Sequence, residues 1–174
     1  FRQYINEGVY DPGIFKAFFL AGGPGSGKTF VTNTAFSGTG LKLVNSDNAF
    51  EKGLKKANLS LKMPDEEEYF RNIIRQRAKT TAGNMLDQYV QGRLGLIIDA
   101  TGRDLGLVQR QVGMLRQLGY DCHMIFVNTS LDVALERNRN RPRSIPEYIV
   151  QKSWQGVQAN IGQFQRIFSP NKML

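Results

Sequence analysis

Short apolar runs alternate with longer amphipathic stretches along the chain. Residues 14–20, 41–44, 94–99 and 123–127 are apolar almost throughout, which is typical of strands covered on both faces of a parallel sheet. The stretches between them repeat their apolar residues at the spacing of a helix. This alternation predicts an α/β domain in which a parallel sheet is flanked by helices.

Polar residues mark the ends of several expected helices. Acidic residues follow Pro64, in the first turn of a long helix to about Val90, where the helix dipole favours negative charge. The other expected helices cover residues 28–35 and 104–118, begin after a cap at Ser130, and run from Pro146 toward Phe168. No repeat, low-complexity tract or linker divides the sequence, so we expect residues 1–174 to form a single domain.

The composition is that of a globular domain. Of the 174 residues, 41% are hydrophobic and 22% are charged, close to the average of folded proteins. No apolar stretch approaches the roughly 20 residues that span a bilayer, and none at the start has the pattern of a signal peptide. The single cysteine, Cys122, cannot form an internal disulfide and suits a reducing compartment. We therefore expect a cytoplasmic protein without a membrane partner.

A glycine-rich loop follows the first expected strand. Residues 22–29 match the pattern G-x-x-x-x-G-K-[ST] in full. Glycines let successive backbone N–H groups surround phosphate groups, and the helix that begins at Lys28 adds its positive end to the same anion. Lys28 is expected to reach the β- and γ-phosphates, and Thr29 to coordinate Mg²⁺. The residues expected to bind ATP are Gly23, Pro24, Gly25, Ser26, Gly27, Lys28 and Thr29.

Two aspartates follow expected strands, and both should lie near this loop. Ligands of open α/β sheets bind outside the carboxyl ends of the strands, and Asp47 and Asp99 each stand at such an end. An acid at the place of Asp99 orients Mg²⁺ in P-loop proteins, directly or through water. The alternative is an ordinary aspartate that caps the next helix, and the glycine loop makes the metal role the favoured one.

The chain is basic, with 23 lysines and arginines against 15 acidic residues and a formal net charge of +8. This charge favours phosphate-bearing partners, nucleic acid among them, although solubility alone would also account for it. Arg137 and Arg141 are four apart and would share one helix face, from which both could neutralise charge on a transferred phosphoryl group. Arg139 and Arg143 would point elsewhere if the helix continued, although Pro142 should end it near Arg141. A solvated basic face is the alternative.

Four segments together resemble the polynucleotide-kinase and zeta-toxin branch of the P-loop kinases. They are residues 22–29, the segment Val44-Asn45-Ser46-Asp47, residues 97–103, and residues 136–141 followed by Ile145-Pro146. The resemblance spans residues 14 to 165. It implies a three-layer P-loop NTPase fold with a short arginine-rich lid at about residues 137–146, and ATP with Mg²⁺ as cofactors.

The resemblance also implies roles for residues near the acceptor. Asp47 stands where the family has the general base that takes the proton of the acceptor hydroxyl, a role that phosphoryl transfer itself requires. The alternative is that Asp47, or Ser46 beside it, only caps the next helix. Thr101 and Arg103 stand where zeta-toxin-like proteins bind the acceptor. The family normally has another strand after the position of Leu174, so the resemblance implies a final strand that this sequence lacks.

One position departs from the family pattern. Phage-type polynucleotide kinases resemble one another in having an arginine three residues after the catalytic aspartate, where it meets the acceptor's phosphate, and this chain has Phe50 there. The acceptor is therefore open, and we expect a hydroxyl on a nucleic-acid end, a nucleotide or a nucleotide sugar. The alternatives to a kinase are a non-catalytic nucleotide-binding module and a simple NTPase.

Overall fold

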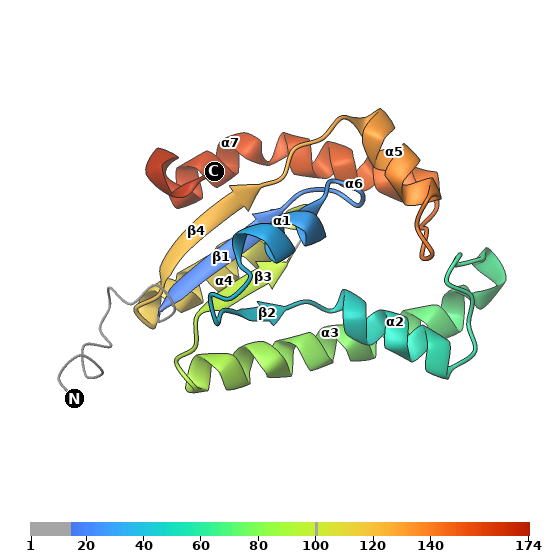
Figure 1. Ribbon diagram of the computed structural model, residues 1–174, viewed down its shortest axis with the longest axis horizontal. Helices are drawn as coiled ribbons and strands as arrows, with labels where there is room; N and C mark the ends of the chain where they lie inside the picture. The colour runs from blue at the N-terminus through green and yellow to red at the C-terminus, as the bar shows by residue number, and fades with distance from the viewer. Residues whose placement is uncertain (1–14, 100) are drawn as a thin grey trace.

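The computed structural model describes residues 15–99 and 101–174. Its sheet has four parallel strands in the order β2-β3-β1-β4 (Figure 1). These strands are β1 (Lys16–Ala21), β2 (Lys42–Val44), β3 (Leu96–Asp99) and β4 (Asp121–Phe126). The four predicted strands are confirmed with small shifts at their ends, and residue 14, where the first was expected to start, lies outside the described residues.

Helices cover both faces of the sheet, as the three-layer prediction requires. On one face lies the short helix α1 (Lys28–Ala35) (Figure 1). Against the other pack α3 (Glu68–Gln91), α4 (Leu105–Gln117) and α7 (Ile161–Phe168), whose buried apolar residues form one cluster with alternate residues of β1. Phe19 of β1 is 1% exposed, and Phe164 and Phe168 of α7 are fully buried against it.

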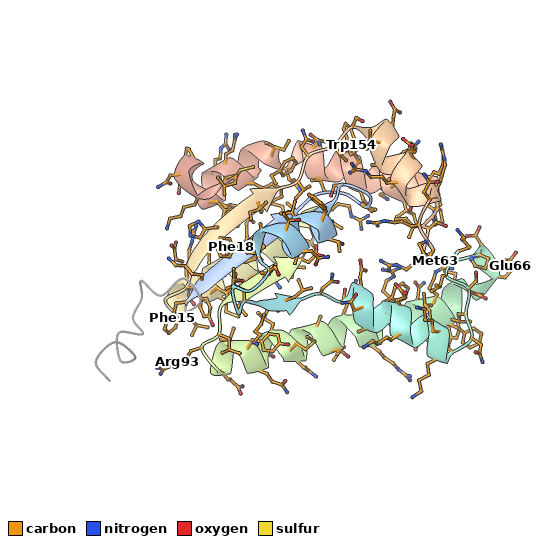
Figure 2. The ribbon with its side chains drawn as sticks, in the orientation of Figure 1. Phe15, Phe18, Met63, Glu66, Arg93 and Trp154 are labelled. Atoms are coloured by element: carbon orange, nitrogen blue, oxygen red, sulfur yellow. The ribbon has the colours of Figure 1, made fainter. Side chains whose placement is uncertain are left out.

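A second, smaller unit projects past the carboxyl ends of the strands. It consists of α2 (Asp47–Lys56) and the first half of α3, joined through a short 3-10 turn, η2 (Asp65–Glu67). Its own apolar cluster contains Phe50, Leu54, Met63 and Ala78, and Figure 2 places Met63 at this projecting end. Across from it lie α5 (Leu131–Arg139) and the loop that leads to α6 (Glu147–Ala159) (Figure 1). The carboxyl edge of the sheet is therefore enclosed by two separate structural units.

Two expected helices end earlier than the sequence suggested. The helix expected from Pro146 toward Phe168 is broken at Asn160, whose Nδ2 donates to the backbone oxygens of Gly102 and Arg103 at 2.9 and 3.0 Å. The helix carrying Arg137 ends at Arg139 because residues ahead of a proline avoid helical geometry. Arg141 therefore lies beyond α5, and the expectation that it shares a helix face with Arg137 is wrong.

The last residues run beside β4. Met173 forms a parallel bridge with Met124, and the Leu174 amide donates to the Met124 oxygen at 2.9 Å. The Leu174 oxygen in turn accepts from the Phe126 amide at 2.7 Å, so the chain extends the sheet beyond β4. Among the described helices, none combines the length and apolar character needed to cross a membrane.

Candidate active site

The phosphate loop (residues 22–29) joins β1 to α1 at the centre of the sheet edge. The Gly22 amide donates to the Thr101 oxygen at 3.0 Å, which ties the loop to the segment after β3. Gly25 has a φ of 83°, and a Cβ there would lie 2.5 Å from the Ala134 oxygen of α5. Only glycine fits this left-handed, closely packed position, so the loop depends on it at this point.

Lys28 and Asp99 face each other beside this loop with incomplete compensation of charge. Lys28 Nζ donates to the Gly22 oxygen at 2.7 Å and lies 4.0 Å from Asp99 Oδ1. Burial lowers the pKa of Lys28, with the charge of Asp99 opposing the effect. Burial likewise raises the pKa of Asp99, with Lys28 opposing. Each charge is thus poorly solvated and only loosely paired, which suits a site that completes itself with phosphate oxygens or a cation.

Asn45 links the two predicted aspartates. Its Nδ2 donates to Asp99 Oδ2 at 2.7 Å, and its Oδ1 accepts from the Asp47 amide at 2.6 Å. The ends of β2 and β3 are thereby held together, as the sequence predicted for Asp47 and Asp99. Asn45 belongs to one of the four motif segments, but the motif alone predicted no role for it.

The structure does not place either aspartate as a helix cap. Asp47 is the first residue of α2, and the cap position belongs to Ser46, whose side chain makes no capping hydrogen bond. The side chain that meets the start of the helix is that of Asn45, which accepts from the Asp47 amide. The helix after Asp99 is capped by Asp104, whose Oδ1 accepts from the Leu107 amide at 2.9 Å. Asp99 is 12% exposed and Asp47 is 54% exposed, so Asp47 is open to a ligand.

Arg143 forms an ion pair with Asp47 that the sequence did not indicate. Its Nη2 lies 2.9 Å from Asp47 Oδ2, and its Nη1 donates to Oδ1 at 3.4 Å. The expectation that Arg143 points elsewhere applies only to a helix that continues, and α5 ends at Arg139. The pair joins the loop after α5 to the start of α2 across the sheet edge. It forms because α5 ends at Arg139 and lets the loop turn back toward α2.

Phe50, the residue that departs from the family pattern, supports two guanidinium groups. The ring is 1% exposed, with the Arg75 guanidinium 4.1 Å and the Arg143 guanidinium 5.8 Å from its centroid. Such contacts are attractive because the ring face carries negative charge density. Arg75 lies in the middle of α3, and no motif in the sequence pointed to it.

Arg137 contacts the phosphate loop directly. Its Nη1 donates to the Gly25 and Ser26 oxygens, both at 3.2 Å. Arg137 and Arg141 also line a hollow of about 720 Å³ between the phosphate loop, α1 and α5. Arg139 is engaged elsewhere, in an exposed pair with Glu147 at 2.6 Å, as predicted. The structure thus brings both candidate arginines to the nucleotide side, from a helix and from the loop after it.

The two residues after β3 that are candidates for binding the acceptor have different surroundings. Thr101 is next to the phosphate loop through its backbone oxygen, and its Oγ1 accepts from the Arg103 amide at 3.4 Å. The Arg103 side chain packs against Gly156 of α6, where a Cβ would lie 2.7 Å from Arg103 Cγ. Within the described residues, no hydrogen bond or ion pair joins Arg103 to Asp47.

The residues present fit a nucleotide with Mg²⁺. The buried Ser26 Oγ in the phosphate loop has no hydrogen-bond partner among the described residues, which leaves a donor for a ligand. Residues 15–99 and 101–174 hold no group of three His, Cys, Asp or Glu side chains that could bind a metal alone. Mg²⁺ is commonly held by one or two protein oxygens together with substrate phosphates. Thr29 and Asp99 offer oxygens of that kind.

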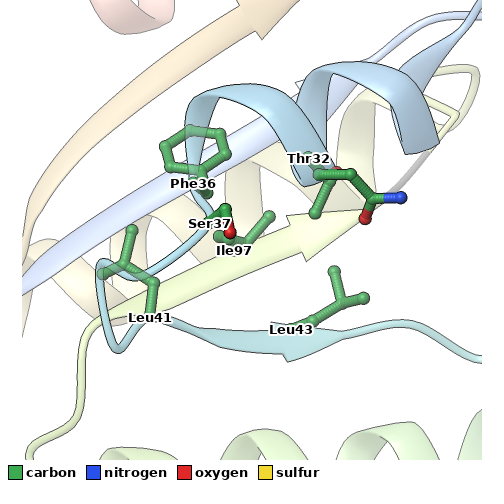
Figure 3. Close-up of a pocket in the computed structure, with 7 residues that line it drawn as sticks. Thr32, Phe36, Ser37, Leu41, Leu43 and Ile97 are labelled. Atoms are coloured by element: carbon green, nitrogen blue, oxygen red, sulfur yellow. The ribbon is translucent and has the colours of Figure 1, made fainter.

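A second hollow, of about 300 Å³, lies between α1 and β2 (Figure 3). Its lining consists of Thr32, Asn33, Phe36, Ser37, Leu41, Leu43 and Ile97. None of these side chains is charged, so this hollow has no cation to balance a phosphate and no carboxylate to take a proton.

Trp154 lies behind the phosphate loop and is partly buried. Its Nε1 donates to the Thr129 oxygen at 2.8 Å. Figure 2 shows it on α6, above the phosphate loop. Its backbone comes within 3.5 Å of where a Cβ of Gly23 would lie. Trp154 therefore supports the phosphate loop through packing.

Comparison with known proteins places the chain in a family. The family described as AAA domain (AAA_33) matches residues 18–164, most of the chain. No curated protein matches it in sequence.

Solved structures share its fold at low identity. A chain of the Pnkp1/Rnl/Hen1 RNA repair complex has a TM-score of 0.65 and 21% identity, covering 91% of this chain and 48% of that one. A chain of the AvrRxo1-ORF1:AvrRxo1-ORF2 complex with sulphate ions has a TM-score of 0.71 and 14% identity, covering 90% and 52%. A chain of the PezAT toxin–antitoxin system of Streptococcus pneumoniae has a TM-score of 0.53 and 19% identity, covering 72% and 52%. This chain therefore spans about half the length of these proteins.

These matches agree with the predicted resemblance to the polynucleotide-kinase and zeta-toxin branch. The parallel sheet, the phosphate loop after β1 and the family match together imply nucleotide binding. The chain belongs to the AAA domain family and has a P-loop kinase-like fold.

Proposed function

We propose that this protein is a kinase that moves the γ-phosphate of ATP to a hydroxyl group of a nucleic-acid end, a nucleotide or a nucleotide sugar. The observation that carries the proposal is the hydrogen-bonded chain from the Asp99 carboxylate through Asn45 to the backbone amide of Asp47, which begins beside Lys28 of the phosphate loop. A protein that only binds a nucleotide does not need an exposed carboxylate beside the phosphate loop at the edge of the sheet. A kinase needs one to accept the proton of the acceptor.

On the ATP side, Lys28 and the amides at the start of α1 would bind the β- and γ-phosphates. One of the AvrRxo1 structures with the same fold holds ATP, which supports ATP as the donor here. Thr29 and Asp99 would hold Mg²⁺, which when bound neutralises charge on the phosphates. Arg137, hydrogen-bonded to the Gly25 and Ser26 oxygens, would contact the same phosphates together with Arg141. We propose residues 137–146 as a lid over them.

On the acceptor side, Asp47 would act as the general base. The acceptor oxygen attacks the γ-phosphorus, the bond from that phosphorus to the bridging oxygen breaks, and ADP leaves. The hydroxyl proton passes to the Asp47 carboxylate. Thr101, beside the phosphate loop, stays a candidate for contacting the acceptor, while the packing of Arg103 against α6 favours a role in holding the loop.

Radiolabelled phosphate transfer from ATP tests the proposal directly. Candidate acceptors are 5′-hydroxyl oligonucleotides, nucleosides and nucleotide sugars, each tried with the unaltered protein and with Asp47→Asn. We expect Asp47→Asn to lower transfer by about 100- to 10,000-fold, because the proton then has no acceptor, and to leave ATP affinity within a few fold. Asp87→Asn, an exposed residue of α3, is the matched control and should behave as the unaltered protein.

The alternatives give different results in the same assay. Transfer that survives Asp47→Asn removes Asp47 from the role of base. ATP hydrolysis without transfer to any acceptor identifies a simple NTPase. Binding of ATP with neither hydrolysis nor transfer identifies a regulatory nucleotide-binding module.

A further inference from the structure

We propose that Arg75 and Arg143, stacked around the Phe50 ring, bind a phosphate group carried by the acceptor and make the enzyme specific for phosphorylated acceptors. The proposal rests on the proposed kinase function and assigns a recognition role to residues outside the nucleotide site. We call Phe50 with these two arginines the Phe50 cluster.

Three separate elements build the Phe50 cluster. Phe50 comes from α2, Arg75 from the middle of α3, and Arg143 from the loop after α5. The buried ring lies under both guanidinium groups, at 4.1 and 5.8 Å. Contact with the ring fixes the plane of a guanidinium while leaving its N–H groups available, which is the arrangement that bidentate phosphate binding needs.

The charge around the cluster is strongly positive. Arg71, Arg75 and Arg143 bring three guanidinium groups to this site, and Asp47 is the carboxylate that acts on Arg75. A second carboxylate, Glu51, is near Arg143 and is paired with Lys55 at 2.8 Å. Arg71 is engaged by the Pro64 oxygen at 2.7 Å, and Arg143 by Asp47. Within the described residues, Arg75 has no carboxylate at ion-pair distance. Burial lowers the pKa of Arg75, with Asp47 opposing, so its positive charge is held in a half-buried place without a partner of its own.

A phosphate on the acceptor would supply that partner. It would also change the pairing of Arg143, whose two nitrogens now hold both oxygens of Asp47. A phosphate carries more negative charge than a carboxylate and accepts the same bidentate fork. Arg143 would shift its contact from Asp47 to the phosphate, and this shift would free Asp47 to take the proton of the acceptor hydroxyl. Acceptors without a phosphate would leave Asp47 paired.

Equilibrium binding tests the proposal without any phosphoryl transfer. Calorimetry would measure two pairs of compounds, adenosine with adenosine 3′-monophosphate, and glucose with glucose 1-phosphate, with the phosphate loop saturated by Mg²⁺ and a non-hydrolysable ATP analogue. We expect the phosphorylated member of at least one pair to bind at least about tenfold more tightly, as a charge-assisted contact would give. The pair that shows the preference distinguishes a nucleotide phosphate from a sugar phosphate.

Arg75→Met should abolish most of this preference, because methionine keeps an apolar contact with Phe50 and loses the charge. Arg77→Met, an exposed residue of the same helix, is the control and should keep the preference. Equal affinity for both members of both pairs in the unaltered protein would overturn the proposal, and so would an unchanged preference in a folded Arg75→Met variant. Binding that follows the expectation while no acceptor is phosphorylated would contradict the kinase function alone.

Arg143→Met gives a second readout that a purely structural role would not move. Because Asp47 is then no longer paired, we expect the ratio of turnover on adenosine to turnover on adenosine 3′-monophosphate to rise by about tenfold. A ratio that stays the same, with the variant folded, would contradict the shift of Arg143 from Asp47 to the acceptor.

Discussion

The two ends of the sheet each hold a carboxylate, and the surroundings of these two groups shift their pKa values in opposite directions. At the carboxyl end, Asp99 lies 4.0 Å from Lys28 and accepts a hydrogen bond from the neutral amide of Asn45 at 2.7 Å. At the amino end of β4, Asp121 is hydrogen-bonded by Lys172 at 2.6 Å, by His123 at 2.9 Å and by Lys16 at 3.1 Å. Burial raises the pKa of Asp99. Burial alone would also raise the pKa of Asp121, but its three hydrogen bonds together hold it well below its ordinary value.

The difference separates stability from function within one small sheet. The contacts of Asp121 join β1, β4 and the last turn of the chain, so they stabilise the fold. The charges of Lys28 and Asp99 are left without full solvation or close pairing, which destabilises the free protein and is favourable only once a ligand completes the site. Charge that the fold leaves uncompensated therefore points to the ligand site better than a count of charged residues does.

Among the changes at the two ends of the sheet, replacing Lys28 should have the largest effect on function. Lys28→Ala removes the main cation for the β- and γ-phosphates, so we expect transfer to fall by about 100- to 1,000-fold, with a clear loss of ATP affinity. The melting temperature should stay the same or rise, because a poorly solvated charge is removed. Calorimetry with ATP and a thermal melt measure the two quantities, with Lys79→Ala on the exposed face of α3 as control. Unchanged affinity would contradict the assignment of the phosphate loop.

Replacing each aspartate in turn tests the comparison between the two ends of the sheet. Asp121→Asn should lower the free energy of unfolding by about 2 kcal/mol at neutral pH, because its charged partners lose their anion. Asp99→Asn should leave stability unchanged or raised, since burial disfavours the charge that it removes. Denaturant unfolding monitored by circular dichroism measures both. A larger loss of stability for Asp99→Asn than for Asp121→Asn would mean that the ends have the reverse roles.

The pH dependence should differ in sign for the same two residues. The pKa of Asp121 is lower in the folded state than in the unfolded chain, so the unfolded chain binds more protons in acid, and the stability due to Asp121 is lost as the pH falls below about 4. The pKa of Asp99 is raised, so the native state binds more protons and the ionisation of Asp99 lowers stability as the pH rises through the folded pKa.

The same shift should affect ligand binding. Protonated Asp99 cannot bind a cation, so the Mg²⁺-dependent part of ATP affinity should fall in mild acid, at a higher pH than for an ordinary aspartate. ATP affinity is measured with and without Mg²⁺ between about pH 4.5 and 8. The pH at which the Mg²⁺-dependent part is lost is then compared with the ordinary aspartate pKa near 4. Asp99→Asn should lack that pH step, and a step of equal size in the variant would assign it to another group.

The smallest effect concerns Cys122, beside Asp121. Burial raises the pKa of Cys122 to about 11, and the thiol is 1% exposed. At pH 8 the folded protein should react with a thiol reagent at least about 100-fold more slowly than the protein in denaturant, because the thiolate is rare and shielded. A spectrophotometric thiol titration measures the rate. Fast labelling of the folded protein would show that the amino end of the sheet opens readily.

Sequence reasoning succeeded where chain connectivity decides position. The phosphate loop, Asp47 and Asp99 each follow a strand, and in a parallel sheet the carboxyl ends of neighbouring strands meet at one edge. The cap at Ser130 was also predicted, since it depends on a few successive residues. Asn45 could have been found by the same reasoning, because it too directly follows β2.

The failures lie where contacts depend on how whole elements pack. Arg141 was assigned to a helix face, although α5 ends two residues earlier, at Arg139, with Pro142 ahead. Asn160 broke the last helix because its side chain found the oxygens of a loop 57 and 58 residues away in sequence. Neither outcome is set by local propensity alone.

By itself, the sequence determined that the chain is an α/β P-loop domain and that two carboxylates stand near the loop after the first strand, which it predicts to bind phosphates. Only the tertiary structure decided that Arg75 and Arg143 meet over Phe50 and that Arg143 holds Asp47. The physical reason is that a strand end is placed by chain connectivity. The meeting of α2, α3 and the loop after α5 is instead placed by packing of the small apolar cluster around Phe50.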